Sequence, residues 1–588
     1  MATTDNTANG PEAAHGRPAV DFDTIVIGAG FGGVRMMYEC QKRGMTAKLF
    51  EAGSNVGGTW YWNRYPGART DTESWVYILT FLEEIDMGWK WKERFPTQPE
   101  VEQYVNHVVD HLDLRKDMEF NNRVTAAHRD ESNNIWKVTT SKGTTYTCNF
   151  LITATGPLAT PLKPPFPGLD SFKGESYLTG LWPKHKVDFT NKRVAIIGTG
   201  ATSVQIVPLV AHTAKSLTVF QRTPSFVLPA RNHPLTDDQQ AELQRDCLNI
   251  FKRVRGSVFG MDFADPRGRF TDIKSDAEAQ RVLDFGWETG GFRFIFQTFA
   301  DMLTNKECND LAAEFIRNKI RSVVKDQETA ELLCPYYPVL AKRPPLGHYY
   351  YEAFNRDNVK LVDVKKNPIK EITPTGLRTG TAEYEFDVII FALGFDAITG
   401  TLAQIDLRGS QGQDLGQQLR ERLATAYGIT VENFPNLFMM TGPLSPFANI
   451  PVVTDNTADW IGRTIMYMRD HGYARMDTKR ETAEAWREKV NAVFNATVLP
   501  QGARDTHSWY VGANVEGKPV EPLFWLGGVG PYFQECENEI KNDFPGFSFS
   551  SSTRDSSSRG YGLEIENAES ASSSTGTTNS DGTRESHL

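Results

Sequence analysis

The chain has 588 residues, of which 40% are hydrophobic and 23% are charged, and its formal net charge is −10. This size and balance are typical of a folded protein with several domains, and the acidic charge argues against a nucleic-acid-binding protein, which usually presents a basic surface. The sequence contains no apolar stretch long enough to span a membrane, and its polar N-terminus does not resemble a secretory signal.

Cysteine and histidine spacing exclude several classes of site. The six cysteines form no C-x-x-C pair, which excludes a zinc ribbon and a thioredoxin-like redox pair and suits a reducing compartment such as the cytoplasm. The eleven histidines show no H-E-x-x-H or other metal-ligand spacing. We therefore expect no metal site.

Alternating strand and helix patterns predict an α/β fold. Three apolar runs that each stop at glycine are expected to be buried strands: DTIVIGAG at 23–30, KRVAIIGTG at 192–200 and FDVIIFALG at 386–394. Apolar positions at helical spacing predict a helical insertion over 235–333. Residues 1–20 and the Ser-rich stretch 547–588 are expected to be disordered tails.

The first glycine turn, GAGFGG at 28–33, lies between a predicted strand and a predicted helix. Gly28 permits the tight turn, Gly30 lets the backbone approach a pyrophosphate, and Gly33 allows the helix to pack on the strand. The next strand, TAKLFE, ends at Glu51, which is placed to accept hydrogen bonds from ribose hydroxyls. A glycine turn alone is weak evidence, but this combination favours a dinucleotide site.

A second glycine turn repeats the pattern after the second strand. Its residues are Gly198, Thr199, Gly200, Ala201, Thr202 and Ser203. The strand that follows, LTVFQR, ends at Arg222, where the first unit has Glu51. Because a carboxylate repels a 2′-phosphate and an arginine can pair with it, we predict FAD in the first unit and NADPH in the second. The alternative for Arg222 is a solvated surface arginine.

Two such units in one chain indicate a flavin that is reduced by a nicotinamide. A disulfide reductase would pass the electrons to a cysteine pair, which this sequence lacks. An oxygenating enzyme needs only O2, a shielded flavin and a nearby cation.

Several longer motifs resemble Baeyer–Villiger monooxygenases, the family that includes cyclohexanone and phenylacetone monooxygenases. The main one is GGTWYWNRYPGARTDTESWVY at 57–77. The others are ATG at 154–156, FQRTPSFVLPARN at 220–232, AKRPPLGHYYYEAFNRDNVKLVD at 341–363, ALGFDAITG at 392–400 and SWYVGAN at 508–514. The resemblance covers about residues 20–540, so it extends over nearly the whole chain between the tails.

The resemblance implies two cofactor sites and a catalytic pair. Residues implied to contact FAD are Thr59, Trp60, Asp71, Tyr77 and the backbone of Val124. Residues implied to hold NADPH are Arg222, Thr223, Lys342, Arg343 and Trp509. Arg343 would be the active-site arginine and Asp71 would orient it. Taken alone, Asp71 reads as a loop carboxylate that caps a turn, and the aromatic residues Tyr61, Trp62 and Tyr65 read as plain core packing.

The resemblance also implies a division into two Rossmann-like dinucleotide-binding domains, each built from two stretches of chain. The FAD-binding domain would comprise 21–165 and 391–546, and the NADPH-binding domain 166–234 and 334–390, with the insertion at 235–333.

One position departs from the family. Its fingerprint F-x-G-x-x-x-H-x-x-x-W-P reads FKGESYLTGLWP at 172–183, so Leu178 occupies the histidine position. That segment links the two cofactor domains in the family, so NADPH positioning is open to change. The substitution removes no group that the chemistry requires.

The predicted function is conversion of a ketone to an ester or lactone with O2, through a flavin peroxide. One alternative is a related monooxygenase that oxidises amine nitrogen or sulfur, and another is a non-catalytic protein that binds FAD and NADPH. The expected partner is a small ketone, and we expect neither nucleic acid nor a membrane span. The chain ends Ser586-His587-Leu588, which is similar to the S-K-L peroxisomal address or is a chance ending.

Overall fold

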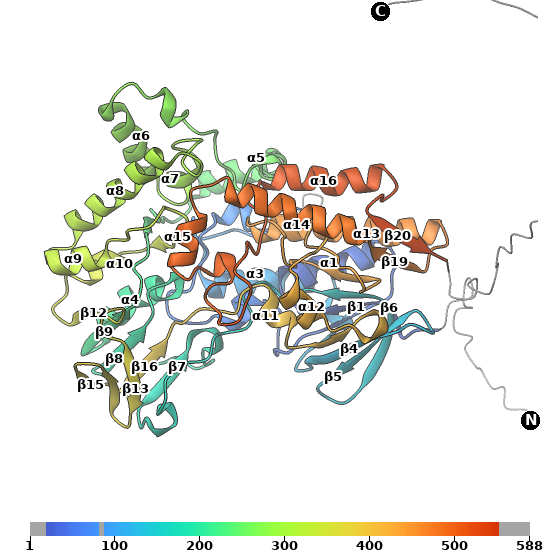
Figure 1. Cartoon of the computed structure of the whole chain (residues 1–588), viewed down its shortest axis with the longest axis horizontal. Coiled ribbons are helices and arrows are strands. Elements are labelled where there is room, and N and C mark those ends of the chain that lie inside the picture. Colours follow the sequence, from blue (N-terminus) through green and yellow to red (C-terminus); the bar gives the residue numbers. More distant parts are fainter. Residues whose placement is uncertain (1–18, 82–87, 552–588) are drawn as a thin grey trace, which may run out of the picture. The chain divides into compact units, whose positions relative to one another are not determined.

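The computed structural model describes residues 19–81 and 88–551. Its first sheet is built around β1 (Phe22–Ile27), the strand that precedes the first glycine turn (Figure 1). The strands are β1 (Phe22–Ile27), β2 (Ala47–Phe50), β3 (Met118–Glu119), β4 (Val124–Asp130), β5 (Ile135–Thr140), β6 (Thr145–Thr153), β17 (Asp406–Arg408) and β18 (Leu437–Met439). They run in the order β17-β4-β5-β6-β1-β2-β3, and β18 also pairs with β6. β1 is parallel to β2 and β6 and has a buried inner half, as expected for a covered sheet.

The second sheet is parallel throughout. Its strands are β7 (Glu175–Leu178), β8 (Arg193–Ile197), β9 (Ser216–Gln221), β12 (Val359–Asp363) and β16 (Val388–Phe391). They run in the order β12-β9-β8-β16-β7, with β8 and β16 buried at the centre. The three expected strands are therefore present as β1, β8 and β16, and the predicted α/β class is confirmed.

A helix follows the glycine turn in each sheet: α1 (Phe31–Lys42) after β1 and α4 (Ala201–Thr213) after β8. Both helices are buried on most sides, since consecutive residues such as 33–37 of α1 and 203–208 of α4 are buried. A long helix, α13 (Ile450–Asp470), packs along α1. Arg35 of α1 and Asp455 of α13 form a buried ion pair of 2.6 Å between these two helices.

Helices occupy the region of the expected insertion. They are α5 (Asp237–Gly256), α6 (Asp276–Thr289), α7 (Arg293–Phe296), α8 (Lys306–Val323) and α9 (Gln327–Leu333), and Figure 1 shows α6, α8 and α9 grouped together. Thr236 starts α5 with a capping box, in which its hydroxyl accepts from the backbone N–H of Gln239. Asn305 caps α8 through its side-chain oxygen, which accepts from the backbone N–H of Cys308.

Further helices and small sheets complete the architecture. Further helices are α2 (Thr59–Trp62), α3 (Gln98–His111), α10 (Tyr350–Ala353), α11 (Thr399–Leu402), α12 (Leu415–Glu421), α14 (Arg480–Asn495), α15 (Pro500–Asp505) and α16 (Val529–Lys541). The 3-10 helices are η1 (Ser74–Val76), η3 (Arg115–Asp117), η4 (Leu169–Ser171), η5 (Thr179–Leu181), η6 (Phe270–Asp272), η7 (Ser410–Gly412) and η8 (Trp509–Val511). Small sheets pair β10 (Leu228–Pro229) with β11 (Leu346–Gly347), β14 (Gly376–Thr379) with β13 (Ile369–Thr373) and β15 (Glu383–Glu385), and β19 (Arg475–Thr478) with β20 (Phe547–Ser550).

Strand β20 corrects the expected start of the C-terminal tail at residue 547. Phe547–Ser550 pairs antiparallel with β19, and Phe547 is buried against Trp460 with ring centroids 5.8 Å apart. Serine dominates the composition here, but the sequence FSFS alternates aromatic and polar residues, which is the period of a strand.

The other expectations for the tails concern residues 1–18 and 552–588, which lie outside the described residues, as does Ser586-His587-Leu588. Across residues 19–81 and 88–551, no helix combines the length and apolar composition that crossing a bilayer requires.

Gly33→Ala should destabilise the first unit. A Cβ at Gly33 would lie 1.8 Å from the carbonyl oxygen of Gly28, whereas one at Gly30 would meet only the Cα of Gly58, at 3.5 Å. Overpacking of this kind costs about 1–3 kcal/mol, and a backbone atom cannot move aside as a side chain can. Urea unfolding of the flavin-free proteins should show a lower free energy of unfolding for Gly33→Ala than for the control Gly30→Ala. Equal values would contradict the close approach of α1 to the turn.

Candidate active site

The first glycine turn brings the GGTW stretch beside the N-terminus of α1. Gly28 has a φ of +103°, and a Cβ there would lie 2.6 Å from the carbonyl oxygen of Ala154. The N–H of Gly57 donates to the carbonyl of Ala29 at 2.9 Å. Thr59, at the start of α2, is exposed next to this contact.

Glu51 is fixed at the end of β2. One of its carboxylate oxygens accepts from the N–H of Ala29 at 2.8 Å and the other from the N–H of Gly53 at 2.6 Å. Its backbone carbonyl accepts from the N–H of Asn122 at 3.0 Å, which brings the start of β4, with buried Val124, close to the same strand end. Each carboxylate oxygen has further acceptor capacity, so Glu51 fits the predicted contact with ribose hydroxyls.

The N-termini of α1 and α4 suit phosphate groups. Within the described residues, no side chain caps either helix, and neither has an acidic residue in its first turn. Their first N–H groups and the positive ends of their dipoles are therefore available to an anion. A Cβ at Gly200 would meet no atom within 4 Å, so this turn has open space beside the backbone. Both turns thus fit a dinucleotide pyrophosphate.

The second glycine turn is built like the first. Gly198 has a φ of +108°, and a Cβ there would lie 2.4 Å from the carbonyl oxygen of Ala392. Ser203 occupies the position equivalent to Gly33, and its hydroxyl donates to the carbonyl of Gly198 at 2.6 Å. The hydroxyl of Thr199 donates to the carbonyl of Thr223 at 2.9 Å, which joins the turn to the segment after β9.

Two cations lie close together beside this second turn. Arg222 is exposed directly after β9, and Lys342 lies on the loop between α9 and β11. Burial, together with the positive charge of Arg222, lowers the pKa of Lys342 to about 8. Two cations that repel each other in this way are suited to binding a dianion such as a 2′-phosphate.

Arg343 and Asp71 form an ion pair. The guanidinium donates to a carboxylate oxygen of Asp71 at 2.6 Å, and the Asp71 side chain is 5% exposed, against 31% for Arg343. Burial raises the pKa of Asp71, and the charge of Arg343 opposes that rise. Burial also acts to lower the pKa of Arg343, but the charge and hydrogen bond of Asp71, together with the neighbouring Tyr510 and Tyr65, outweigh burial and the pKa is raised. The guanidinium therefore keeps its charge at any physiological pH.

The loop that carries Asp71 is held on both sides. The N–H of Ser74 donates to the carbonyl of Arg94 at 2.8 Å, and the buried carboxylate of Glu73 accepts from the Arg94 guanidinium at 3.1 Å. Glu73 also accepts from Arg293 of α7, so the loop is tied to the helical insertion. These contacts fix Asp71 before any ligand binds.

Trp60 and Tyr77 form an aromatic wall at the start of α1. The indole N–H of Trp60 donates to the hydroxyl of Tyr77 at 3.1 Å. The Tyr77 ring meets Phe31, the first residue of α1, edge to face at 5.3 Å. Burial raises the pKa of Tyr77 to about 12. The two residues lie beside the first glycine turn, where the resemblance implies FAD.

Trp509 lies on η8 at the surface of an aromatic cluster. Its ring is 4.9 Å from Tyr510 and 5.6 Å from Phe524. Ser508 caps this short helix by accepting from the N–H of Tyr510.

Two tyrosines belong to the site although the sequence analysis did not select them. The hydroxyl of Tyr65, which we expected to be plain core packing, donates to Gln205 of α4 at 3.1 Å, and burial together with the charge of Asp71 raises its pKa to about 12 against the opposing charge of Arg343. Tyr510 is fully buried, burial raises its pKa against the opposing charge of Arg343, and its hydroxyl has no partner among the described residues. Tyr510 adjoins Trp509 in the SWY stretch, but only the fold reveals the unpaired hydroxyl.

Leu178 lies at the end of β7, at the edge of the second sheet. It pairs with Phe391 of β16 and packs against an apolar cluster that includes Phe172. A leucine suits these surroundings, because a histidine ring would need polar partners here.

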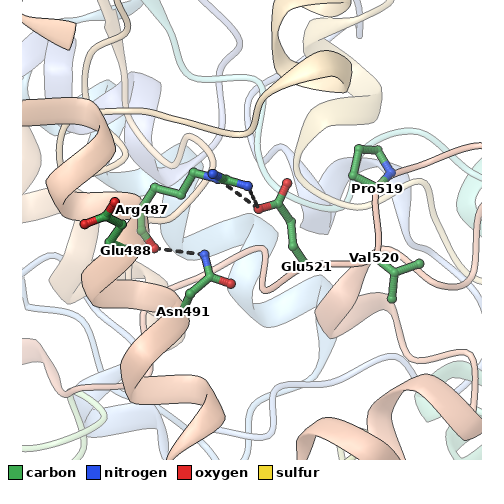
Figure 2. Close-up of a pocket in the computed structure, with 6 residues that line it drawn as sticks. All are labelled: Arg487, Glu488, Asn491, Pro519, Val520 and Glu521. Carbon is green, nitrogen blue, oxygen red and sulfur yellow. Dashed lines mark hydrogen bonds and ion pairs between the residues drawn. The ribbon is translucent and has the colours of Figure 1, made fainter. Parts of the chain in front are cut away.

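A surface hollow of about 520 Å³ lies apart from all of these residues. Figure 2 shows its lining, Arg487, Glu488, Asn491, Pro519, Val520 and Glu521. The Arg487 guanidinium donates to Glu521 across it at 3.0 Å. It contains none of the residues that the sequence analysis selected, so we assign no ligand to it.

Comparison with known proteins gives consistent matches. The family model described as pyridine nucleotide-disulphide oxidoreductase matches residues 25–253. A Baeyer–Villiger monooxygenase of Pseudooceanicola batsensis is 42% identical over 87% of this chain and 93% of its own length. A phenazine N-monooxygenase of Lysobacter antibioticus is 38% identical over 90% of this chain and 96% of its own length.

The fold of the chain is similar to the crystal structure of OTEMO in complex with FAD and NADP. The TM-score is 0.87 at 40% identity, and the match covers 91% of this chain and all of that one. Sequence and fold therefore agree over nearly the entire described chain.

Binding of a 2′-phosphorylated nicotinamide cofactor should weaken at alkaline pH. Lys342 has a pKa of about 8, so it is charged at lower pH. At pH values above 8 it must take up a proton in order to bind the phosphate as a cation. The affinity for NADP+ should therefore fall about tenfold between pH 7 and pH 9, while that for NAD+ stays constant.

Two variants test the cause of this pH dependence. Lys342→Arg should abolish the decline, because a guanidinium does not lose its proton in this range. Arg222→Ala should weaken NADP+ binding at least about tenfold and move the decline to higher pH, since it removes the charge that lowers the pKa of Lys342. Titration of the oxidised enzyme gives these dissociation constants. Equal losses for NADP+ and NAD+ would show that the two cations do not contact the 2′-phosphate.

Proposed function

The chain belongs to the Baeyer–Villiger monooxygenase family, and we propose that it converts a ketone to an ester or lactone with O2. It binds FAD and NADPH, and the electrons pass from NADPH to FAD. The observation that carries the proposal is the Arg343–Asp71 ion pair, which places a permanent cation among the residues of both glycine-turn units.

The residues around each turn fit the two cofactors. Glu51, Trp60 and Tyr77 would hold FAD at the first turn, where α1 directs its N-terminus to the pyrophosphate. Arg222 and Lys342 would hold the 2′-phosphate of NADPH at the second. When bound and reduced, FAD supplies the electrons that activate O2.

Arg343 would stabilise the negative charge that develops on the carbonyl oxygen when the ketone is attacked. A donor that is already oriented towards such an oxyanion lowers the activation free energy by about 3–4 kcal/mol. The ion pair with Asp71 keeps the guanidinium charged and fixes its direction. Tyr510 and Trp60 are buried in the same region, whereas the Arg343 side chain is 31% exposed.

A second candidate function is oxidation of amine nitrogen or sulfur. The similarity to a phenazine N-monooxygenase favours it, at 38% identity. The Lys342-Arg343 pair and the GGTWYWNRYPGA stretch support the ketone reaction instead. A non-catalytic binding protein has Leu178 as its only support, and the fold accommodates that residue without disturbing either turn.

We also propose the domain division expected from the sequence. The strands of residues 21–165 and 391–546 support it, because they form the first sheet together. There are two exceptions: β16, which belongs to the second sheet and ends at Phe391, and β19, which belongs to a small sheet. β7, β8, β9, β12 and β16 form the second sheet.

A panel of cyclic, linear, aryl and steroid ketones tests the proposed function. At least one ketone should increase NADPH oxidation and yield an ester or lactone, as shown by product analysis. Turnover of amines or sulfides alone would favour the second candidate. No stimulation by any of these compounds would favour the non-catalytic protein.

Arg343→Ala should separate the two halves of the reaction. Hydride transfer needs only that nicotinamide and flavin stack, so flavin reduction should stay within about tenfold of the parental rate. This decrease is smaller than the decrease in rate that follows removal of a hydrogen-bond donor to a developing negative charge. Ester formation should almost stop, and the oxidised NADPH should appear as hydrogen peroxide. Arg343→Lys should restore little, because a point charge on a flexible stem lacks the planar fork. Ester formation by Arg343→Ala above about a tenth of the parental rate would assign charge stabilisation to another residue.

A further inference from the structure

The segment from 508 to 518, which carries Trp509 and Tyr510, is attached to the loop after β16. The side-chain amide of Asn514 donates to the carbonyl of Phe395 at 2.8 Å. The ammonium of Lys518 donates to a carboxylate oxygen of Asp396 at 2.8 Å and to the carbonyl of Ala397 at 2.7 Å. The 508–518 segment is thereby joined to three consecutive residues of one loop.

That loop is one of two connections between the sheets. After β16 the chain leaves the second sheet and returns to the first at β17, and after β6 it passes from the first sheet to β7 in the second. The two connections pair with each other: the N–H of Asp396 donates to Thr160 at 2.9 Å, and that of Leu162 donates to Gly394 at 3.0 Å. Lys518 is therefore attached where both connections cross.

The contact of Lys518 is largely withdrawn from water. Its side chain is only 8% exposed, whereas that of Asp396 is 27% exposed. A buried ammonium without its carboxylate would be costly, so this pair is far less dispensable than an ion pair at the surface.

The backbone at the point of attachment is strained. Ile398 has a φ of +67°, which is rare for a β-branched residue, and the N–H of Thr399 donates back to the carbonyl of Ala397 at 2.8 Å. Lys518 binds the same carbonyl. Such a turn persists only where its surroundings hold it in place.

The other end of the segment reaches the active site. Tyr510 is fully buried next to Arg343, and its carbonyl accepts from the N–H of Leu523 at 3.0 Å. Trp509 packs on Tyr510 at the edge of the same cluster. At most eight residues lie between Lys518 and either of these two rings in the sequence. A displacement of the Lys518 side chain from its partners would therefore also move Trp509 and Tyr510.

We propose that Lys518, with Asn514, is a positioning residue that holds Trp509 and Tyr510 over the site and thereby couples NADPH oxidation to oxygen insertion. This rests on the proposed function. Coupled turnover converts ketone, O2, NADPH and a proton into ester, NADP+ and water. Uncoupled turnover converts O2, NADPH and a proton into NADP+ and hydrogen peroxide, so the two are distinguished by their products.

A second ion pair on the following part of the chain, in which the cation is 34% exposed against 8% for Lys518, provides a control. Arg487 of α14 pairs with Glu521 at 2.9 Å. Figure 2 shows this pair. Glu521 lies only three residues beyond Lys518 in the sequence. It attaches the chain to α14 and not to the connections between the sheets. Loss of this pair removes a charge contact of similar length without releasing Asn514 or Lys518.

The test compares Lys518→Met and Asp396→Asn with Arg487→Met in the flavin-bound enzyme. Lys518→Met and Asp396→Asn should give less ester per NADPH oxidised and more hydrogen peroxide, with flavin reduction by NADPH at the parental rate. Hydrogen exchange of residues 508–518 with NADP+ bound should be about tenfold faster than in the parental enzyme. Loss of a hydrogen bond to a charged group changes the equilibrium for local opening by about that factor. Arg487→Met should retain parental coupling and exchange, and Lys518→Arg should restore part of the coupling.

The proposal is overturned if Lys518→Met retains the parental ester yield per NADPH, or if Arg487→Met uncouples to the same extent. The double variant Lys518→Met/Asp396→Asn should be no worse than the worse single variant, and additive losses would also contradict the proposed pair. Should Lys518→Met fail to bind flavin, Asn514→Ala carries the same test. A parental enzyme that oxidises no ketone would refute the proposed function, while hydrogen exchange would still decide the role of Lys518.

Discussion

The carboxylate of Asp71 is buried, and the cation that pairs with it comes from Arg343, 272 residues further along the chain. A buried carboxylate without a cation would be strongly unfavourable, so this ion pair requires the Asp71 loop and the segment after α9 to stay together. The loop is held by Arg94 and by Arg293 of the helical insertion. The insertion therefore contributes to the site although it contains none of the predicted site residues.

The two glycine turns show how one supersecondary unit serves two ligands. In both, a glycine with positive φ lies against the carbonyl of an alanine at the end of a neighbouring strand, Ala154 in one and Ala392 in the other. The differences lie at the ends of the following strands. Glu51 is fixed by backbone N–H groups, whereas Arg222 is exposed beside Lys342. By register, Arg222 lies one residue beyond the position equivalent to Glu51, and this difference in charge would distinguish a ribose from a 2′-phosphate.

Short segments of the first unit contact the second unit directly. The hydroxyl of Tyr65 reaches Gln205 of α4, whose amide donates to the carbonyl of Arg69 at 3.1 Å. Leu178 packs within the edge of the second sheet, so the departure from the family fingerprint is absorbed by apolar neighbours. Lys518 joins the segment of Trp509 to the crossing of both connections.

The sequence by itself determined the α/β class, the central strands β1, β8 and β16, both glycine turns and the family, because strand periodicity and glycine spacing are local properties of the chain. It also pointed to Asp71 and Arg343, but only through a resemblance, since nothing local shows that they meet. The tertiary structure alone decided the lowered pKa of Lys342, the Tyr510 hydroxyl without a partner within residues 19–81 and 88–551, the strand at Phe547 and the contact between Lys518 and Asp396. Each of these depends on burial or on a neighbour far away in sequence, and spacing along the chain does not encode either.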